Sequence, residues 1–288
     1  MIYLSKFRFP GEEDEARFLA DNWRAKQNCY SSYYPFGLFA ERCLPTLEFL
    51  EITILYGGNG SGKTTLLNVM ADALGLQRHA EYNRTPFFDS YVGLSSAETE
   101  RPVPRNSLIL TSDDVFDYML DLRAVNDRID TRREELFDDL DDLRRRKFQL
   151  HSMKDYDELK QVSAARRLSN SQAARQMLPV NLRTQSNGES ALAVFNERIS
   201  ENALYLLDEP ENSLSPQRQQ ELAQYLHDSA RFYNCQFVIA THSPFLLAMP
   251  GARVYDLDAE PVVTKRWTQL ENVRATWEFF KGHEKEFQ

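Results

Sequence analysis

The sequence predicts an α/β fold with a mostly parallel core sheet. One observation is a set of short strand-like runs at residues 47–56, 107–111, 203–207 and 237–240, of which the last two are almost wholly apolar. Uninterrupted apolar runs are typical of parallel strands that are covered on both faces. A second observation is the strongly helical sequence between these runs, because parallel strands need long crossover connections. The third is the glycine-rich stretch after Tyr56, which makes the first run the start of a strand-loop-helix unit.

The two ends of the chain predict outer elements of this fold. Residues 2–9 alternate in polarity as a strand does, and Pro10-Gly11 ends them. Acidic residues at 12–15 then precede an amphipathic helix. Near the other end, residues 254–264 read as edge strands around a proline, and a helix begins at about Leu270. We therefore expect an antiparallel β part beside the parallel core.

The middle of the chain has a different composition. From Val115 to Leu178 it contains neither proline nor glycine, and apolar residues recur in steps of three and four. This spacing predicts a helix about 45 Å long, with a second helix at 155–177 returning antiparallel to it. We predict an inserted helical lobe at 115–179 and a discontinuous head made of 1–114 and 180–288. Two arrangements stay open, a lobe packed on the head and a protruding coiled hairpin.

Charge, cysteine content and hydrophobic patterning restrict the class of protein to which the chain can belong. The net charge of −9 argues against a chain that coats nucleic acid through its overall charge, although a local basic patch remains possible. Three scattered cysteines (Cys29, Cys43 and Cys235) suit a reducing compartment better than a disulfide framework. No apolar run approaches the roughly 20 residues that span a bilayer, and the first residues lack the apolar core of a signal peptide. We expect a cytoplasmic protein without direct membrane insertion.

Residues 57–64, GGNGSGKT, match the phosphate-binding pattern G-x-x-x-x-G-K-[ST]. Glycines let the backbone curl so that successive N–H groups point at a phosphate, and the following helix adds its positive N-terminal end. Lys63 can reach the β- and γ-phosphates, and the Thr64 hydroxyl can ligand Mg²⁺. The predicted nucleotide-binding residues here are Gly57, Gly58, Asn59, Gly60, Ser61, Gly62, Lys63, Thr64 and Thr65.

Two acids follow the apolar run at 203–207. In open α/β sheets ligands bind at the carboxyl ends of the strands, where Asp208 and Glu209 stand. Asp208 would hold Mg²⁺ directly or through water, and Glu209 would polarise the water that attacks the γ-phosphate. Together with the upstream phosphate-binding loop, these acids predict ATP and Mg²⁺ as cofactors and ATP hydrolysis as the reaction.

Two weaker motifs complete the set. The run QSNGES at 185–190 directly precedes a predicted helix, so Ser186 or Ser190 could simply cap that helix. His242 follows the strand at 237–240 and could reach a γ-phosphate, although a lone histidine is more often an ordinary polar residue.

These four elements, in this order, resemble the ATP-binding-cassette (ABC) ATPases, and more closely their non-transporter branch. That branch includes structural-maintenance-of-chromosomes heads, recombination ATPases and overcoming-lysogenization-defect nucleases. The resemblance covers the chain outside about 115–180. Two runs look most like the patterns of the non-transporter branch, DEPENSLSP at 208–216 and Thr241-His242-Ser243-Pro244. The resemblance implies two heads that sandwich two ATP molecules, each signature loop capping the γ-phosphate held by the other head. The implied parts are Walker A at 57–64, a signature loop with Ser186, Gly188 and Glu189, Walker B at Asp208 and Glu209, a D-loop at 212–215 and the switch residue His242.

The chain departs from the branch's pattern at several points. Asn187, Glu189 and Ser215 replace the branch's usual glycine, glutamine and histidine. No glutamine follows the run at 107–111, so Ser112, Asp113 or Asp114 stands at the Q-loop position, with Asp113 as the metal candidate. Tyr34 and Phe36 are candidates for stacking on adenine, with core packing as the alternative role.

Three functions follow from these motifs. The first is an ATP-gated dimeric switch or motor that acts on nucleic acid or on a second, effector protein, as in bacterial DNA maintenance or anti-phage defence. The alternative is the nucleotide-binding subunit of a membrane transporter, which the inserted lobe and the DEPE-type D-loop disfavour. A module that binds ATP without turnover is disfavoured by Glu209. The segment after Asp258 is too poor in clustered acids to hold the nuclease domain of some relatives.

Overall fold

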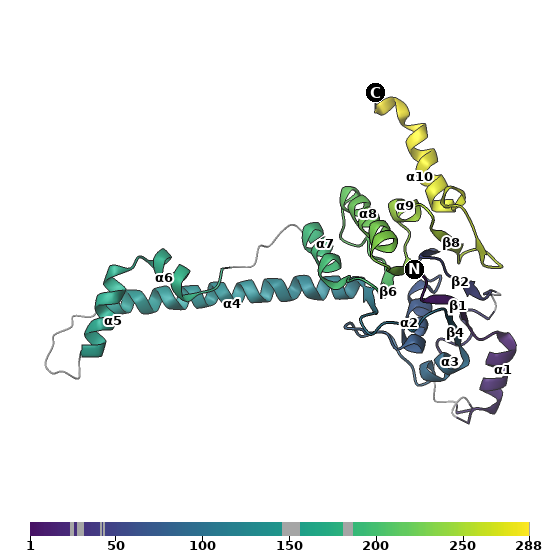
Figure 1. Cartoon of the computed structure of the whole chain (residues 1–288), viewed down its shortest axis with the longest axis horizontal. Coiled ribbons are helices and arrows are strands. Elements are labelled where there is room, and N and C mark those ends of the chain that lie inside the picture. The colour runs from purple at the N-terminus through teal and green to yellow at the C-terminus, as the bar shows by residue number, and fades with distance from the viewer. Residues whose placement is uncertain are drawn as a thin grey trace. The chain divides into compact units, whose positions relative to one another are not determined.

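The computed structural model describes residues 1–23, 26–27, 32–40, 42, 44–145, 156–180 and 187–287. The chain divides into two compact units. The first contains residues 1–116 and 187–288, and the second contains residues 117–186. Figure 1 shows their helices and strands in colours that run from purple at the N-terminus to yellow at the C-terminus.

The first unit is built on a six-stranded sheet with the order β5-β6-β7-β3-β8-β9, in which all neighbours are parallel except β8 and β9. Every residue of β3, β6 and β7 is buried, which is why these runs contain so few polar residues. The predicted mostly parallel α/β core is confirmed. Its strands are β3 (Ile52–Tyr56), β5 (Leu108–Thr111), β6 (Leu204–Asp208), β7 (Gln236–Ala240), β8 (Arg253–Asp256) and β9 (Val263–Thr264).

A smaller antiparallel sheet has the order β2-β1-β4, with β1 at Leu4–Arg8, β2 at Leu47–Glu48 and β4 at Ser96–Thr99. The prediction of one strand over 47–56 is therefore wrong. The chain leaves the small sheet after Glu48 and enters the large one at Ile52. Between them, the Leu50 N–H donates to the Thr53 hydroxyl at 2.9 Å instead of to a neighbouring strand.

Helices cover the core sheet (Figure 1). The phosphate-loop helix α2 buries eight residues and ends at Gly75, whose φ of 63° suits a left-handed C-cap. Helix α8 begins as predicted at Pro216, capped by the Ser215 hydroxyl, which accepts from the Arg218 N–H. The helices of this unit are α1 (Glu12–Asp21), α2 (Lys63–Leu74), α3 (Phe88–Leu94), α7 (Asn187–Arg198), α8 (Pro216–Phe232), α9 (Pro244–Leu247) and α10 (Glu271–Gly282), with 3₁₀ turns at Trp267–Gln269 and Glu284–Glu286.

Helix α4 (Ser112–Arg145) starts in the first unit and continues into the second. It begins three residues before the predicted start, because Thr111 and Asp114 form a capping pair. The Thr111 hydroxyl accepts the Asp114 N–H at 3.4 Å, and Asp114 accepts the Thr111 N–H at 2.7 Å. The predicted single helix at 155–177 is wrong, since the structure has α5 (Tyr156–Arg167) and α6 (Asn170–Met177). Ser169 separates them, and its hydroxyl caps α6 by accepting from the Gln172 N–H.

The second unit has its own small core, in which Leu140 of α4 packs with Ala165 of α5 and Ala173 of α6. The Arg144 guanidinium closes this end by donating to the carbonyl oxygens of Ala165 (2.9 Å) and Leu168 (2.7 Å). Arg144 is therefore part of the packing of this unit and not a free cation for phosphate contacts.

The sheet register positions the motifs. At the carboxyl edge Asp208 pairs with Thr111 on one side and with Ala240 on the other, and Leu55 of β3 pairs with the same Ala240. The loops after β3, β6 and β7 thus leave adjacent strands at one edge, as binding sites in open α/β sheets do. Within the described ranges, no helix combines the length and apolar character needed to cross a bilayer.

Candidate nucleotide site

The loop between β3 and α2 requires its glycines. Gly62 has a φ of 94°, and a Cβ built there would lie 2.6 Å from a ring carbon of Phe39. A Cβ on Gly57 would lie 2.4 Å from Ser61 Oγ. The loop therefore curls tightly against its own side chains and against Phe39, and a side chain at either glycine would clash.

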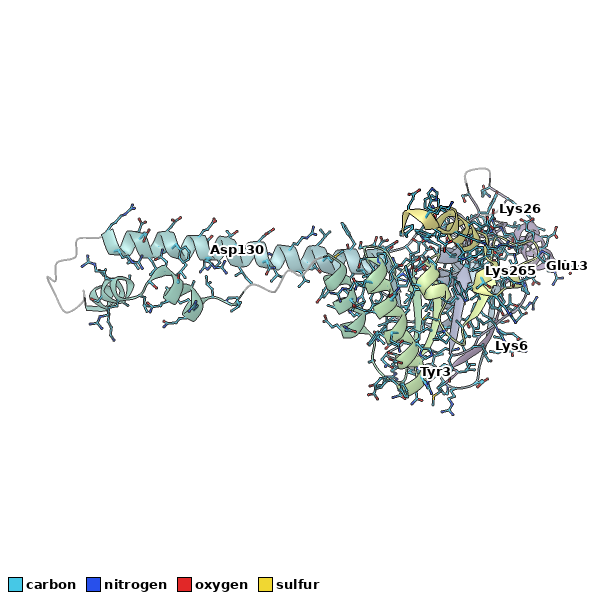
Figure 2. All side chains as sticks on the ribbon, turned by 90° about the horizontal axis from the view of Figure 1, so that it is seen from above. Tyr3, Lys6, Glu13, Lys26, Asp130 and Lys265 are labelled. Carbon is cyan, nitrogen blue, oxygen red and sulfur yellow. The ribbon has the colours of Figure 1, made fainter. Side chains whose placement is uncertain are left out.

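Two residues far away in the sequence hold this loop. Asp258 Oδ2 accepts the Gly58 N–H at 2.7 Å, and Arg42 donates to the Ser61 carbonyl at 3.0 Å. Asp258 is itself oriented by Asp256, whose other oxygen pairs with Lys265 at 2.7 Å (Lys265 is labelled in Figure 2). These contacts could not be predicted from the sequence.

Lys63 lies inside the loop. Its side chain is only 5% exposed, and its ammonium donates to the carbonyl oxygens of Gly57 (2.7 Å) and Gly58 (3.0 Å). Glu209 Oε1 lies 3.9 Å from the same nitrogen. This cation is therefore held between the loop and the acids after β6, at the place where a phosphate would sit if the loop cradles one.

Asp208 is buried next to the start of α2. Burial raises the pKa of its carboxyl to about 6, although a hydrogen bond from the Thr64 hydroxyl acts in the opposite direction. Its Oδ1 is buried and has no hydrogen-bond partner among the described residues. An unsatisfied carboxylate oxygen beside a threonine hydroxyl fits a Mg²⁺ ion, which would satisfy that oxygen.

The acids at this site are too few to form a complete metal cage. Within the part of the chain that the structure describes, no group of three or more His, Cys, Asp or Glu side chains could hold a metal ion. Mg²⁺ commonly takes only one or two protein ligands and completes its octahedron with phosphate oxygens and waters. The residue set therefore fits a metal that arrives with a nucleotide.

Glu209 has an unusual backbone conformation, with a φ of 47° in the left-handed region. Its N–H donates to the Ala240 carbonyl of β7 at 2.9 Å, and its Oε2 accepts from the Asn212 amide at 3.1 Å. A non-glycine residue costs about 1–3 kcal/mol in such a conformation, and such strain is concentrated at functional sites. The carboxylate is 27% exposed, so a water molecule can reach it.

His242 follows β7, as predicted, and its Nδ1 lies 4.0 Å from Glu209 Oε1 and 3.7 Å from Glu211 Oε1. Glu211 is buried, and Oε1 of its side chain also accepts from the Thr241 hydroxyl and from two backbone N–H groups. No role for Glu211 was predicted from the sequence, although the DEPE pattern contains this residue.

The Q-loop candidates differ in their surroundings. Asp114 accepts from the Ala80 N–H and from Thr111, so its carboxylate serves the start of α4. Asp113 is exposed in the first turn of α4, two residues after Thr111, which pairs with Asp208. Asp113 as a metal ligand stays a prediction.

The signature segment is only partly described. Ser186 lies outside the described residues. Gly188 and Glu189 lie in the first turn of α7, which begins at Asn187, and the Glu189 side chain is outside the described part. Because Ser190 is inside the helix, the alternative in which it caps α7 is wrong.

The two aromatic candidates have different environments. Phe36 is buried and stacks on Phe18 with ring centroids 4.9 Å apart, so it belongs to the core. The Tyr34 hydroxyl lies 2.8 Å from Thr65 Oγ1, in the first turn of α2. Tyr34 is therefore the candidate that lies near the phosphate loop.

Comparison with known proteins gives a family. Residues 52–179 and 177–248 match the family model described as "AAA domain, putative AbiEii toxin, Type IV TA system". A search of curated proteins found no match.

Solved structures give distant similarities. An Smc head domain from Pyrococcus furiosus, bound to the C-terminal domain of ScpA, is 13% identical over 98% of this chain and 100% of that chain, with a TM-score of 0.44. The SMC head domain from Thermotoga maritima is 12% identical over 92% and 99%, with a TM-score of 0.38. A putative metal-chelate type ABC transporter is 17% identical over 77% and 74%, with a TM-score of 0.36.

These TM-scores are low, so the assignment rests on the family match together with the motifs at one edge of the sheet. The matched residues include the phosphate loop, the acids after β6 and the histidine after β7. The chain belongs to this AAA-domain family of P-loop ATPases, and it is an ABC-type ATPase head.

Proposed function

We propose that this protein is a Mg²⁺-dependent ATPase that works as a switch. The observation that carries the proposal is the meeting of three groups at one strand edge. The Lys63 ammonium lies 3.9 Å from the Glu209 carboxylate, and the buried Asp208 next to Glu209 has an oxygen without a partner among the described residues. A cation for phosphates, an acid for a metal and an acid for water are the parts that phosphoryl transfer needs.

In this proposal Lys63 leaves the loop carbonyls and contacts the β- and γ-phosphates, and the loop N–H groups of residues 57–65 cradle them. Thr64 and Asp208 hold Mg²⁺, with Asp113 as a further contact directly or through water. Bound Mg²⁺ would neutralise phosphate charge. Glu209 accepts the proton of the attacking water, and His242 contacts the γ-phosphate.

We further propose that ATP pairs two of these heads. A head leaves one side of the γ-phosphate open, and the first turn of α7 offers N–H groups and a positive dipole end. Ser186, Gly188 and Glu189 of one head would then cap the nucleotide of the other. Hydrolysis would remove the contact that holds the pair and so reopen it.

The switch would act on a second protein. The family description names a putative toxin of a type IV toxin–antitoxin system, which favours an effector partner in a bacterial defence role. The second unit is the proposed specificity element, because it has its own packing and the candidate ATP-site residues other than Ser186, its last residue, lie outside it. Nucleic acid is a further possible target. The role as a transporter subunit is not favoured, and a cytoplasmic location fits these assignments.

The ATPase proposal is tested by phosphate release from ATP with the full chain. Release should need Mg²⁺ and should stop when EDTA is added, because Asp208 and Thr64 act through the metal. Lys6→Ala, which removes a half-exposed lysine on β1, is the control for Lys63→Ala and should release phosphate as the wild type does. Release that continues in excess EDTA would contradict the metal assignment.

The pairing proposal is tested by light scattering of Glu209→Gln with Mg²⁺ and either ATP or ADP. The mass should double with ATP only. Ser186→Arg in the same background should stay monomeric, because a bulky cation would occupy the cap, while Ser96→Arg on the exposed strand β4 should pair normally. If Ser186→Arg pairs as well, the segment at 185–190 has no capping role.

A further inference from the structure

The loop of residues 241–243 carries His242 from the end of β7 to α9, and one carboxylate holds it. Glu211 Oε1 accepts from the Thr241 hydroxyl at 2.6 Å, from the His242 N–H at 3.0 Å and from the Ser243 N–H at 3.2 Å. Glu211 is only 6% exposed. Converging donors of this kind compensate the cost of burying a charge, so the carboxylate and the loop stabilise each other.

The second oxygen of Glu211 makes no hydrogen bond within the described residues. The hydrogen bonds of this carboxylate to the loop are therefore all made by Oε1, which also lies 3.7 Å from Nδ1 of His242. That single oxygen fixes the backbone of His242 and lies beside its ring. A shift of Glu211 would therefore move the histidine relative to Glu209, which lies 4.0 Å from the same ring nitrogen.

A second side chain ties the same two segments together. The Ser243 hydroxyl donates to Gln219 Oε1 at 2.7 Å, and Gln219 Nε2 donates to the Leu214 carbonyl at 3.0 Å. Asn212 meanwhile donates to Glu209. The segment of residues 211–214 therefore contacts the proposed catalytic acid through Asn212 and the histidine loop directly through Glu211, and Leu214 is linked to that loop through Gln219.

We propose that Glu211 is a positioning residue, which holds the loop of residues 241–243 so that His242 stays beside Glu209. This rests on the proposed ATPase function.

The first test measures the loop without any catalysis. Hydrogen exchange of the amides of His242 and Ser243 is followed in the wild type, in Glu211→Ala and in Glu211→Gln. Loss of the acceptor should speed their exchange by about tenfold or more, because the two N–H groups lose their acceptor. The amide oxygen of glutamine can still accept, so Glu211→Gln should stay near the wild type. Glu221→Ala, an exposed glutamate on α8 paired with Arg218, is the control.

The second test measures turnover and ATP binding. Glu211→Ala should lower kcat by about tenfold while the ATP dissociation constant changes by less than about threefold, because an interaction that aligns the transition state is lost. Glu211→Gln should recover most of kcat. In a His242→Ala background, Glu211→Ala should have little further effect, because two residues that act through one group are not additive.

The outcomes separate the two proposals. Unchanged exchange at His242 and Ser243 in Glu211→Ala overturns the inference whether or not the wild type hydrolyses ATP. Faster exchange with unchanged kcat overturns the positioning role and leaves a structural one. If Glu211→Ala still lowers kcat by about tenfold in the His242→Ala background, Glu211 does not act through His242, and the proposal is wrong. A wild type without ATPase activity contradicts the proposed function instead, and the exchange experiment still decides whether Glu211 holds the loop.

Discussion

The ammonium of Lys63 lies 3.9 Å from Glu209 Oε1, and both groups lie at the carboxyl edge of the sheet. The same ammonium donates to two carbonyl oxygens of its own loop, Gly57 and Gly58. A buried cation with these partners can exchange the carbonyls for phosphate oxygens without leaving its place between loop and acid.

Lys63→Ala should weaken ATP binding by roughly 10- to 100-fold, because charge-assisted hydrogen bonds contribute about 1.5–3 kcal/mol each. The measurement is titration with ATP and Mg²⁺ by calorimetry. Lys6→Ala on β1, which removes a half-exposed lysine, should bind as the wild type does. Equal affinity of Lys63→Ala and the wild type would show that the ammonium does not contact the nucleotide.

Asp208 gives a pH-dependent prediction for the protein without nucleotide. Its folded pKa of about 6 lies above the ordinary value of 3.8, so the folded state is favoured by the protonated carboxyl at low pH. This contribution is fully present below about pH 4 and is lost as the pH rises through 6.

Asp208→Asn, which stays neutral, should therefore be more stable than the wild type above about pH 7, by roughly 2–3 kcal/mol. The measurement is thermal unfolding in EDTA across this pH range, where the advantage of the variant should shrink as the pH falls. Mg²⁺ and ATP should stabilise the wild type more than the variant. A variant that is less stable at every pH would contradict the raised pKa.

Gly62→Ala should destabilise the protein by about 1–3 kcal/mol and abolish ATP binding, because a φ of 94° is strained for alanine and Phe39 occupies the space of the Cβ. Gly93→Ala is the matched control, since a Cβ there meets nothing within 4 Å and the residue lies in α3. That control should keep or raise stability by up to about 1 kcal/mol. Equal unfolding midpoints for the two variants would show that the loop accommodates a Cβ at position 62, which would contradict the prediction.

Much of this site could be predicted from the sequence, because its motifs are local. The loop of residues 57–64 and the acids Asp208 and Glu209 each follow a buried strand within a few residues. Parallel strands then bring their ends to one edge without further information.

The supporting contacts could not be predicted in this way. Asp258 meets Gly58 across 200 residues of sequence, and Gln219 meets Ser243 across 24. Nothing in the residue types specifies those pairs, which depend on the packing of the strands. Strand β4 was missed for another reason, since all of its residues are exposed and it has no apolar alternation.

The most direct test of the central claim is single-turnover ATP hydrolysis by Glu209→Gln beside direct ATP binding. The amide cannot accept the proton of water, so the rate should fall by roughly 100-fold or more. Binding should be retained or tightened, because a negative charge next to Lys63 and the phosphates is removed. Glu221→Gln on α8 is the control and should hydrolyse at the wild-type rate. Undiminished hydrolysis in a pure Glu209→Gln preparation would contradict the account.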